Sequence, residues 1–210
     1  NSTSAYSIGR RSSFDFEVGN AHFFVLDCRG ERSIHDLKAP DKPGISMLGK
    51  AQKQWLIDGM RKSNAEFFFA VSSVNFMVRH TSGGPYHKGQ AWTSYLQERE
   101  EMIRFWDSLG RPVLILTGDS HTSYTIKITD RLWEVAPGPH NSAHHLVGAS
   151  GYPPNGEFDS GGRKCEMRWS SYIANDVERS FFRHLPLYTL IQVKNAFNNP
   201  NTKEADRWIK

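Results

Sequence analysis

The stretch VLILTGDSHTSYTIKI, residues 113–128, decides the fold class of this chain. An apolar run ends at Gly118, and after a short polar turn hydrophobic and polar residues alternate. A short apolar run bounded by glycine is typical of a buried strand, and alternation is typical of a strand with one exposed face. The turn between them contains Asp119 and His121. A loop does not need a carboxylate and an imidazole two residues apart, so this turn is the first candidate for a functional site.

The segments on the amino-terminal side of this stretch alternate between strand-like and helix-like patterns. Apolar runs predict strands, and apolar residues recurring every three or four positions predict helices. The order is a strand at 22–27, a helix at 48–63, a strand at 66–73, a helix at 92–109 and a strand at 111–118. This order predicts an α/β fold whose sheet is at least partly parallel.

The remaining segments predict that the sheet is mixed. Residues 124–128 and 132–135 have the pattern of an antiparallel pair that turns at Thr129 and Asp130. Residues 187–193 predict a late strand. The polar residues 1–20 and the glycine-rich residues 151–162 are expected to be loops.

Composition limits the partners that this chain is expected to have. Its 210 residues favour one domain, and its net charge of +4 is mild. We expect no nucleic-acid partner, since no polybasic block is present, and no membrane span, since no apolar run is long enough. The two cysteines do not fix the compartment, and Cys28 is expected to be a packed thiol. The chain begins at Asn1 rather than Met, so the location of the protein stays unknown.

Asp119 and His121 have the residue types and the position of metal ligands. Functional groups of α/β sheets gather outside the carboxyl ends of the strands, and Gly118 allows a sharp turn there. In an extended loop, side chains two residues apart point to the same side. An oxygen and a nitrogen donor then face one cation or two adjacent cations. The alternative is that His121 is an ordinary hydrogen-bonded histidine.

Other histidines gather in two loops. His80 and His87 flank a glycine-rich stretch that is expected to border the mouth of the site. His140, His144 and His145 lie within six residues, and such clusters bind zinc or copper. They line the same pocket or form a separate metal site, and the sequence leaves both alternatives open.

The turn also carries a family resemblance. GDSH, residues 118–121, resembles the last metal-binding motif of the calcineurin-like metallophosphoesterases, and more narrowly that of the alkaline phosphatase D (PhoD-like) family. Four other segments resemble family motifs in the same order. They are RRSSFDFEVGNAHFFVLDCRGER at 10–32, LGKAQKQWL at 48–56, AWTSYLQERE at 91–100 and WEVAPGPHNS at 133–142. The resemblance extends over residues 10–193, which is most of the chain.

The resemblance implies a fold, an activity and roles for particular residues. The fold is α/β, as part of a four-layer α/β/β/α sandwich with mixed sheets. The activity is hydrolysis of phosphate esters, either monoesters or diesters, at a dinuclear centre of divalent or trivalent metal ions. The candidate metals are Fe, Ca, Mn and Zn. Asp119 and His121 are implied as metal ligands, and His121 and Arg29 as catalytic residues. With the site completed, the planar fork of either Arg29 or Arg79 would neutralise the charge of the substrate. Members of the family often act outside the cytoplasm.

Further matched positions are expected to be structural rather than catalytic. They hold the helices and the sheet in place, and they are Asp27, Trp92, Tyr95, Glu98 and Arg99.

The chain departs from the family pattern in one respect. The earlier family motifs, Gly-Asp-x-x-Tyr and Asp-Asp-His-Glu, do not occur in it. Residues 1–210 are therefore expected to form the carboxyl-terminal portion of a single metallophosphoesterase domain. Its upstream half, on the same gene product or on a separate chain, would be the partner that supplies the other ligands. Two ligands cannot hold two metal ions, so the chain alone should bind metal weakly.

Two other functions compete with the phosphoesterase. The first is a non-catalytic binding module that retains the sandwich without a complete metal site, which the missing motifs favour. The second is a metal-binding protein centred on residues 140–145, whose metal affinity would survive the loss of Asp119 and His121.

Overall fold

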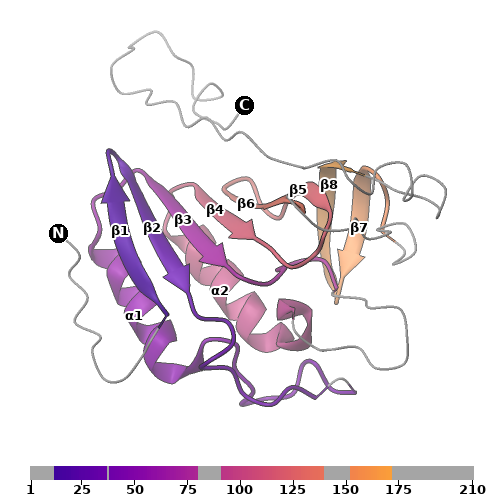
Figure 1. Cartoon of the computed structure of the whole chain (residues 1–210), viewed down its shortest axis with the longest axis horizontal. Helices are drawn as coiled ribbons and strands as arrows, with labels where there is room; N and C mark the ends of the chain where they lie inside the picture. Colours follow the sequence, from indigo (N-terminus) through magenta and orange to yellow (C-terminus); the bar gives the residue numbers. More distant parts are fainter. Residues whose placement is uncertain (1–11, 37, 80–90, 140–151, 172–210) are drawn as a thin grey trace, which may run out of the picture.

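In the computed structural model, which describes residues 12–36, 38–79, 91–139 and 152–171, eight strands form one mixed sheet (Figure 1). The elements in chain order are β1 (Phe14–Val18), β2 (Ala21–Leu26), α1 (Gly49–Lys62), β3 (Phe67–Ser72), the 3₁₀ helix η1 (Trp92–Ser94), α2 (Leu96–Ser108), β4 (Val113–Thr117), β5 (Ser123–Lys127), β6 (Leu132–Pro137), β7 (Gly156–Ser160) and β8 (Arg163–Ser170). The strand order across the sheet is β1-β2-β3-β4-β6-β5-β8-β7.

The centre of the sheet is parallel and its flanks are antiparallel. β2, β3, β4 and β6 are parallel neighbours, while β1 pairs antiparallel with β2. β5 pairs antiparallel with β6 and with β8, and β8 pairs antiparallel with β7. Leu26, Ser72 and Thr117, the last residues of three parallel strands, are in register. The segments that follow these strands therefore leave the sheet at the same edge.

Both α-helices lie on one face of the sheet, and the main core lies between them and the strands (Figure 1). Phe24, Phe68 and Ile115 of the strands are fully buried with Leu56 of α1 and Met102 of α2. The three strand residues lie within the apolar runs from which the strands were predicted. In the part of the chain that the structure describes, no helix is long and apolar enough to cross a membrane.

The opposite face of the sheet carries an apolar row across five strands. Phe16 pairs with Phe23, Phe23 with Phe69, Phe69 with Leu114, and Leu114 with Trp133. The rings of Phe16 and Phe23 stack with centroids 4.9 Å apart, and those of Phe23 and Phe69 with centroids 4.3 Å apart. No helix of the described residues packs on this apolar row, and Phe16 is 41% exposed.

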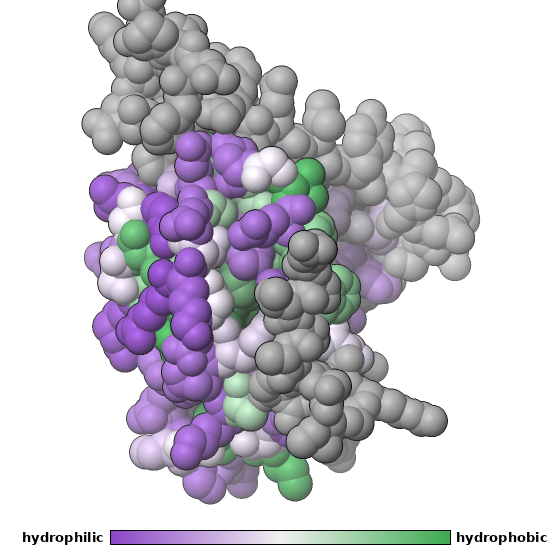
Figure 2. All heavy atoms as spheres, turned by 90° about the vertical axis from the view of Figure 1, so that its left-hand side faces the viewer, coloured by the Kyte–Doolittle hydropathy of each residue, from purple (hydrophilic) through white to green (hydrophobic). Residues whose placement is uncertain are grey.

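β1 corrects the expectation that residues 1–20 are a loop throughout. Its sequence FDFEV places Phe14 and Phe16 on the apolar row's face and Asp15 and Glu17 on the other. His22 of β2 ties this edge to the carboxyl-terminal end of α1, because its ring nitrogens form hydrogen bonds with Asp15 and with Ser63, the residue after α1, both at 2.9 Å. Hydrophilic residues predominate on this side of the molecule, with smaller hydrophobic areas between them (Figure 2).

The β7–β8 hairpin corrects the expectation of a long loop at 151–162. Its two-residue turn consists of Gly161 and Gly162, which both have positive φ, at 60° and 89°. Two positive φ angles match the twist of a tight hairpin, and glycine adopts them without strain. The antiparallel pair of β5 and β6 is confirmed. The strand predicted at 187–193 lies outside the described residues.

Candidate functional site

The candidate site lies at the edge where the parallel strands end. Asp27 and Arg29 follow β2, and Asp119 and His121 follow β4. The strand between them, β3, is followed by Ser73, whose carbonyl oxygen lies 3.6 Å from where a side chain on Gly118 would begin. The topology therefore brings two segments that are about 90 residues apart in sequence to the same edge.

Asp119 and His121 have a backbone conformation that L-residues rarely adopt. Their φ angles are 68° and 53°, and among the described residues they are the only non-glycine positions with positive φ. Such residues cost about 1–3 kcal/mol each and persist only where the surroundings enforce them. The two residues that the sequence selected as metal ligands are therefore the two at which the structure stores backbone strain.

Arg29 is the basic residue that the structure places against this turn. Its Nη2 atom lies 3.5 Å from Oδ2 of Asp119, and its side chain is 51% exposed. The turn that carries it is rigid, since Oδ1 of Asp27 accepts hydrogen bonds from the backbone N–H groups of Arg29 and Gly30 at 2.9 and 2.7 Å. Gln52 of α1 holds Asp27 in turn, accepting from its N–H and donating to its carbonyl.

A buried carboxylate lies behind the turn. Glu134 of β6 is fully buried and accepts hydrogen bonds from Thr117 Oγ1 and Tyr124 Oη, both at 2.9 Å. It also accepts from the backbone N–H groups of Phe76 and Met77, both at 2.8 Å. Burial raises the pKa of Glu134 above its ordinary value, although these four hydrogen bonds oppose the shift. Sequence reasoning missed this residue.

Trp92 and Tyr95 fasten the segment before α2 to the rest of the fold. Trp92 donates from Nε1 to Ser72 Oγ at 3.2 Å, and Tyr95 donates to the carbonyl oxygen of Ser33 at 2.7 Å. Tyr95 also ends the 3₁₀ turn, with φ −136° and ψ 52°, so the helix predicted over 92–109 is two helices. Ser72 also contacts the buried Cys28 thiol at 3.4 Å, and burial raises the pKa of that thiol.

Glu98 and Arg99 fasten α2 to its neighbours. The Glu98 carboxylate accepts from Ser46 Oγ at 2.6 Å and from the backbone N–H groups of Met47 and Leu48, which precede α1. Arg99 donates to the side chain and the carbonyl of Ser160 in β7 at 2.9 and 2.6 Å. These contacts have the structural character expected of the matched motif residues.

The donors gathered at this edge are too few to complete a metal centre. In residues 12–36, 38–79, 91–139 and 152–171, no group of three or more His, Cys, Asp or Glu side chains is placed to hold a metal ion. Asp119 and His121 are donors of the right kind, but a metal ion takes about four to six. His80, His87, His140, His144 and His145 lie outside the described residues. Arg79 lies inside them, and its N–H donates to Tyr152.

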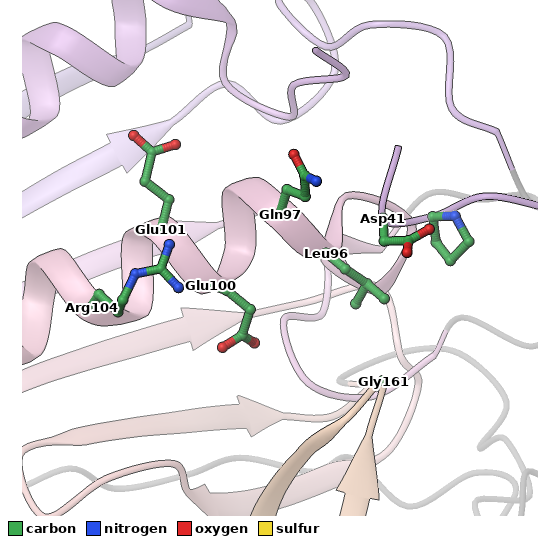
Figure 3. A pocket seen from close by; sticks show the side chains of 8 residues that line it. Asp41, Leu96, Gln97, Glu100, Glu101, Arg104 and Gly161 are labelled. Carbon is green, nitrogen blue, oxygen red and sulfur yellow. The ribbon is translucent and has the colours of Figure 1, made fainter. Parts of the chain in front are cut away.

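A surface hollow of about 740 Å³ lies elsewhere, along α2 (Figure 3). Its charged lining consists of Asp41, Glu100, Glu101 and Arg104, so acidic groups predominate. Glu100 is already paired with Arg99 and Arg163. A negatively charged hollow is unsuited to phosphate esters.

Comparison with known proteins identifies the family of this chain. A family model described as PhoD-like phosphatase matches residues 5–159. The chain is 32% identical over 121 residues to alkaline phosphatase D of Bacillus subtilis (strain 168), an alignment that covers 52% of this chain and 21% of that protein. A solved structure described as "Structure of PhoD" is similar with a TM-score of 0.52 and 25% identity, covering 61% of this chain and 28% of that one. The chain thus spans between a fifth and a third of the length of these relatives.

Proposed function

The chain belongs to the PhoD-like phosphatase family, and from this premise we propose that it forms the carboxyl-terminal part of a metallophosphoesterase domain that hydrolyses phosphate esters. One observation carries the proposal: Asp119 and His121, which follow the parallel strand β4, are both held in strained left-handed conformations. Strain of this kind concentrates at functional sites. The Asp119 carboxylate also faces Arg29, which adds a cation at the same edge.

Asp119 and His121 would hold metal through a carboxylate oxygen and a ring nitrogen. This donor pair suits iron, manganese and zinc, whereas calcium prefers oxygen donors alone. A dinuclear centre supplies a water-derived nucleophile at neutral pH and stabilises charge on the phosphoryl oxygens. His121 needs a fixed tautomer for this role, which the partner of its other ring nitrogen decides.

Arg29 would bind the phosphate of the substrate. Its ion pair with Asp119 is long and half exposed, and such pairs contribute at most about 1 kcal/mol to stability. A guanidinium on a rigid turn at the mouth of the site can bind two phosphate oxygens through its planar fork. Arg29→Lys would keep the charge and lose the fork, so KM should rise while kcat changes less.

The upstream half of the domain is the proposed partner. It would supply the ligands that Asp119 and His121 leave unfilled, and its own sheet would pack on the apolar row that runs from Phe16 to Trp133. Two sheets packed face to face lie about 10 Å apart and exclude water from such rows. The small share of the relatives that this chain spans supports the proposal.

The test is reconstitution with the polypeptide that precedes the chain in its gene. The two parts are co-purified, and hydrolysis of p-nitrophenyl phosphate and bis(p-nitrophenyl) phosphate is measured with each candidate metal and after chelation. Asp119→Asn and His121→Ala should each lower the rate at least about 100-fold, since even outer partners of metal ligands are worth about 10–100-fold. Asp130→Asn, at an exposed turn, is the matched control. Full activity in both ligand variants would refute the proposal.

A non-catalytic binding module is the second candidate. The observation that favours it is the lack of a three-ligand group within the described ranges. Elemental analysis of the reconstituted complex separates the two functions: bound metal in stoichiometric amount supports the phosphoesterase, and its absence together with intact folding supports the binding module.

A further inference from the structure

Glu134 occupies an unusual position for a carboxylate. It lies on the helix-side face of β6 between Leu132 and Ala136, both of which belong to the main apolar core. Its four partners in the described part of the chain are neutral donors rather than basic side chains. Burying a charge without a counter-charge is costly, and an apolar residue of similar volume would fill the same space at less cost. Packing alone therefore does not explain a glutamate at this position.

The hydrogen bonds of Glu134 converge on the candidate site. Thr117 and Tyr124 both donate to the same oxygen, Oε1, and the residues between them are 118–123. A single atom thus fixes both ends of the six-residue segment that carries Asp119 and His121, of which Ser123 is already the first residue of β5. The loop is short, so fixing its ends restricts the φ and ψ angles available inside it.

The same carboxylate also fixes the segment beside the loop. Glu134 accepts hydrogen bonds from the N–H groups of Phe76 and Met77. These two residues lie in the segment after β3, the strand adjacent to β4. Three separate segments of the chain therefore meet at one buried charge. Burial and the neighbouring Glu134 carboxylate raise the pKa of Tyr124 well above its ordinary value, so Tyr124 remains a hydrogen-bond donor.

We propose that Glu134 is a positioning residue that holds residues 118–123 in the strained conformation that presents Asp119 and His121 at the sheet edge. Residues in left-handed conformations persist only when their surroundings enforce them, and Glu134 supplies that enforcement from behind the loop. The claim that this conformation serves metal binding rests on the proposed function. The claim that Glu134 enforces the conformation does not depend on catalysis.

The experiment compares Glu134→Gln with Glu98→Gln in the full chain. Both residues are buried glutamates that accept backbone N–H groups, but Glu98 caps the segment before α1 and does not contact the loop. Three-bond HN–Hα couplings and Cα shifts of Asp119 and His121 report their φ angles. We expect the left-handed values to be lost in Glu134→Gln and retained in Glu98→Gln. A folded Glu134→Gln with unchanged couplings would overturn the proposal.

If Glu134→Gln does not fold, two further variants test whether Glu134 holds residues 118–123 in their conformation. Thr117→Val and Tyr124→Phe each remove one donor to the carboxylate and keep the residue shape. Altered couplings at Asp119 and His121 in either variant support the proposal, and unchanged couplings in both overturn it.

A titration with Mn²⁺ separates this proposal from the proposed function. Paramagnetic broadening of the Asp119 and His121 signals should need about ten times more Mn²⁺ in the variant that loses the couplings, because supporting hydrogen bonds are worth at least about tenfold in metal affinity. The titration is made on the complex with the proposed upstream half, where the ligand set would be complete. Broadening that is absent from the unmodified complex would count against the metal ligands, while the couplings would still decide the role of Glu134.

Discussion

His121 and Asp119 occupy backbone conformations in which a glycine would be less strained. Selection for stability alone would place glycine there, so the side chains themselves must matter. The strain of about 1–3 kcal/mol per residue is comparable to a substantial fraction of the stability of a domain. At the scale of the residue, the backbone conformation that places the proposed metal ligands Asp119 and His121 at the sheet edge lowers the stability of the fold.

This opposition makes a prediction for His121→Gly. The substitution should raise the free energy of unfolding by about 0.5–1 kcal/mol, because relief of strain exceeds the added entropy of the unfolded chain. Urea denaturation of the chain measures the difference. Ser120→Gly is the control within the same loop: Ser120 does not have positive φ, and its hydroxyl donates to the carbonyl of Thr122 at 3.1 Å, so this variant should lose stability. A His121→Gly variant less stable than Ser120→Gly would contradict the explanation.

The sequence predicted a functional role for single residues only where neighbouring residues in the chain supply the signal. Asp119 and His121 stand out because a carboxylate and an imidazole interrupt a strand pattern within three residues. Glu134 carries one signal, an acidic residue between apolar neighbours on the inward side of a strand. Its partners lie 10 to 58 positions away in sequence, so its role depends on pairings that no local pattern reveals.

At the scale of the element, the buried parallel strands and the two helices were predictable and the edge strands were not. β2, β3 and β4 are continuous apolar runs because both faces of the sheet are apolar there. β1 and β7 are short, with five residues each, and they lie in segments rich in polar residues and glycine, so the alternation of Phe with Asp and Glu in them was overlooked. The sheet stabilises them through partners that the local sequence does not contain.

The contacts of Glu98 predict how α1 is stabilised. Glu98→Ala would leave the Ser46 hydroxyl and the N–H groups of Met47 and Leu48 without their acceptor. An unsatisfied buried donor costs about 1–3 kcal/mol, so the free energy of unfolding should fall by at least that amount. Chemical denaturation measures the loss. Glu101→Ala, which removes an exposed partner of Lys53, is the control and should change stability by less than about 1 kcal/mol.

The junction of α2 with the β7–β8 hairpin predicts a dependence of stability on pH. Burial alone would raise the pKa of Glu100, but hydrogen bonds and charges from Arg163 and Arg99 outweigh it and hold the pKa below 4.5. A carboxyl group with a lowered pKa stabilises the fold above its unfolded value and loses that contribution as the pH falls through its folded value. The chain should therefore be more stable than Glu100→Gln at neutral pH, and the difference should vanish in acid below pH 4.5.

Denaturation of both forms across the pH range checks this prediction. Glu157→Gln serves as the control, because Glu157 is exposed on the same hairpin and takes no part in the ion pairs of Glu100. A difference between the chain and Glu100→Gln that stays constant down to acid pH would contradict the assigned ion pairs.

At the scale of the whole molecule, the apolar row gives the sheet a second face to bury. Phe16→Ser should lower the stability of the isolated chain by only about 0.5–1.5 kcal/mol, because the ring that is removed is partly exposed, although it stacks on Phe14 and Phe23. Its affinity for the proposed upstream half should fall about tenfold, since a few residues, often aromatic, carry most of the binding energy of an interface. Calorimetric titration measures the affinity. Glu17→Ser, on the opposite face of the same strand, should leave it unchanged.

The order of the strands was the least predictable property of the whole molecule. The alternation of strands and helices indicates parallel pairing, and the pattern at 124–135 indicates a hairpin. Neither shows that β6, rather than β5, joins the hairpin to β4. That choice depends on which strand can bury apolar residues on both faces: β6 has Trp133 and Val135 on one face and Leu132 and Ala136 on the other.

The insertion of β6 between β4 and β5 has a consequence for biosynthesis. A ribosome releases the chain from its amino terminus, so β5 emerges before the strand that attaches it to the sheet. Until β6, which carries Glu134, has left the exit tunnel, Thr117 and Tyr124 lack the carboxylate to which both donate. The segment between them is therefore not yet held in its final conformation in the nascent chain. The left-handed geometry of Asp119 and His121 would then arise only once β6 has emerged, after the strands and helices that precede it are already available to pair.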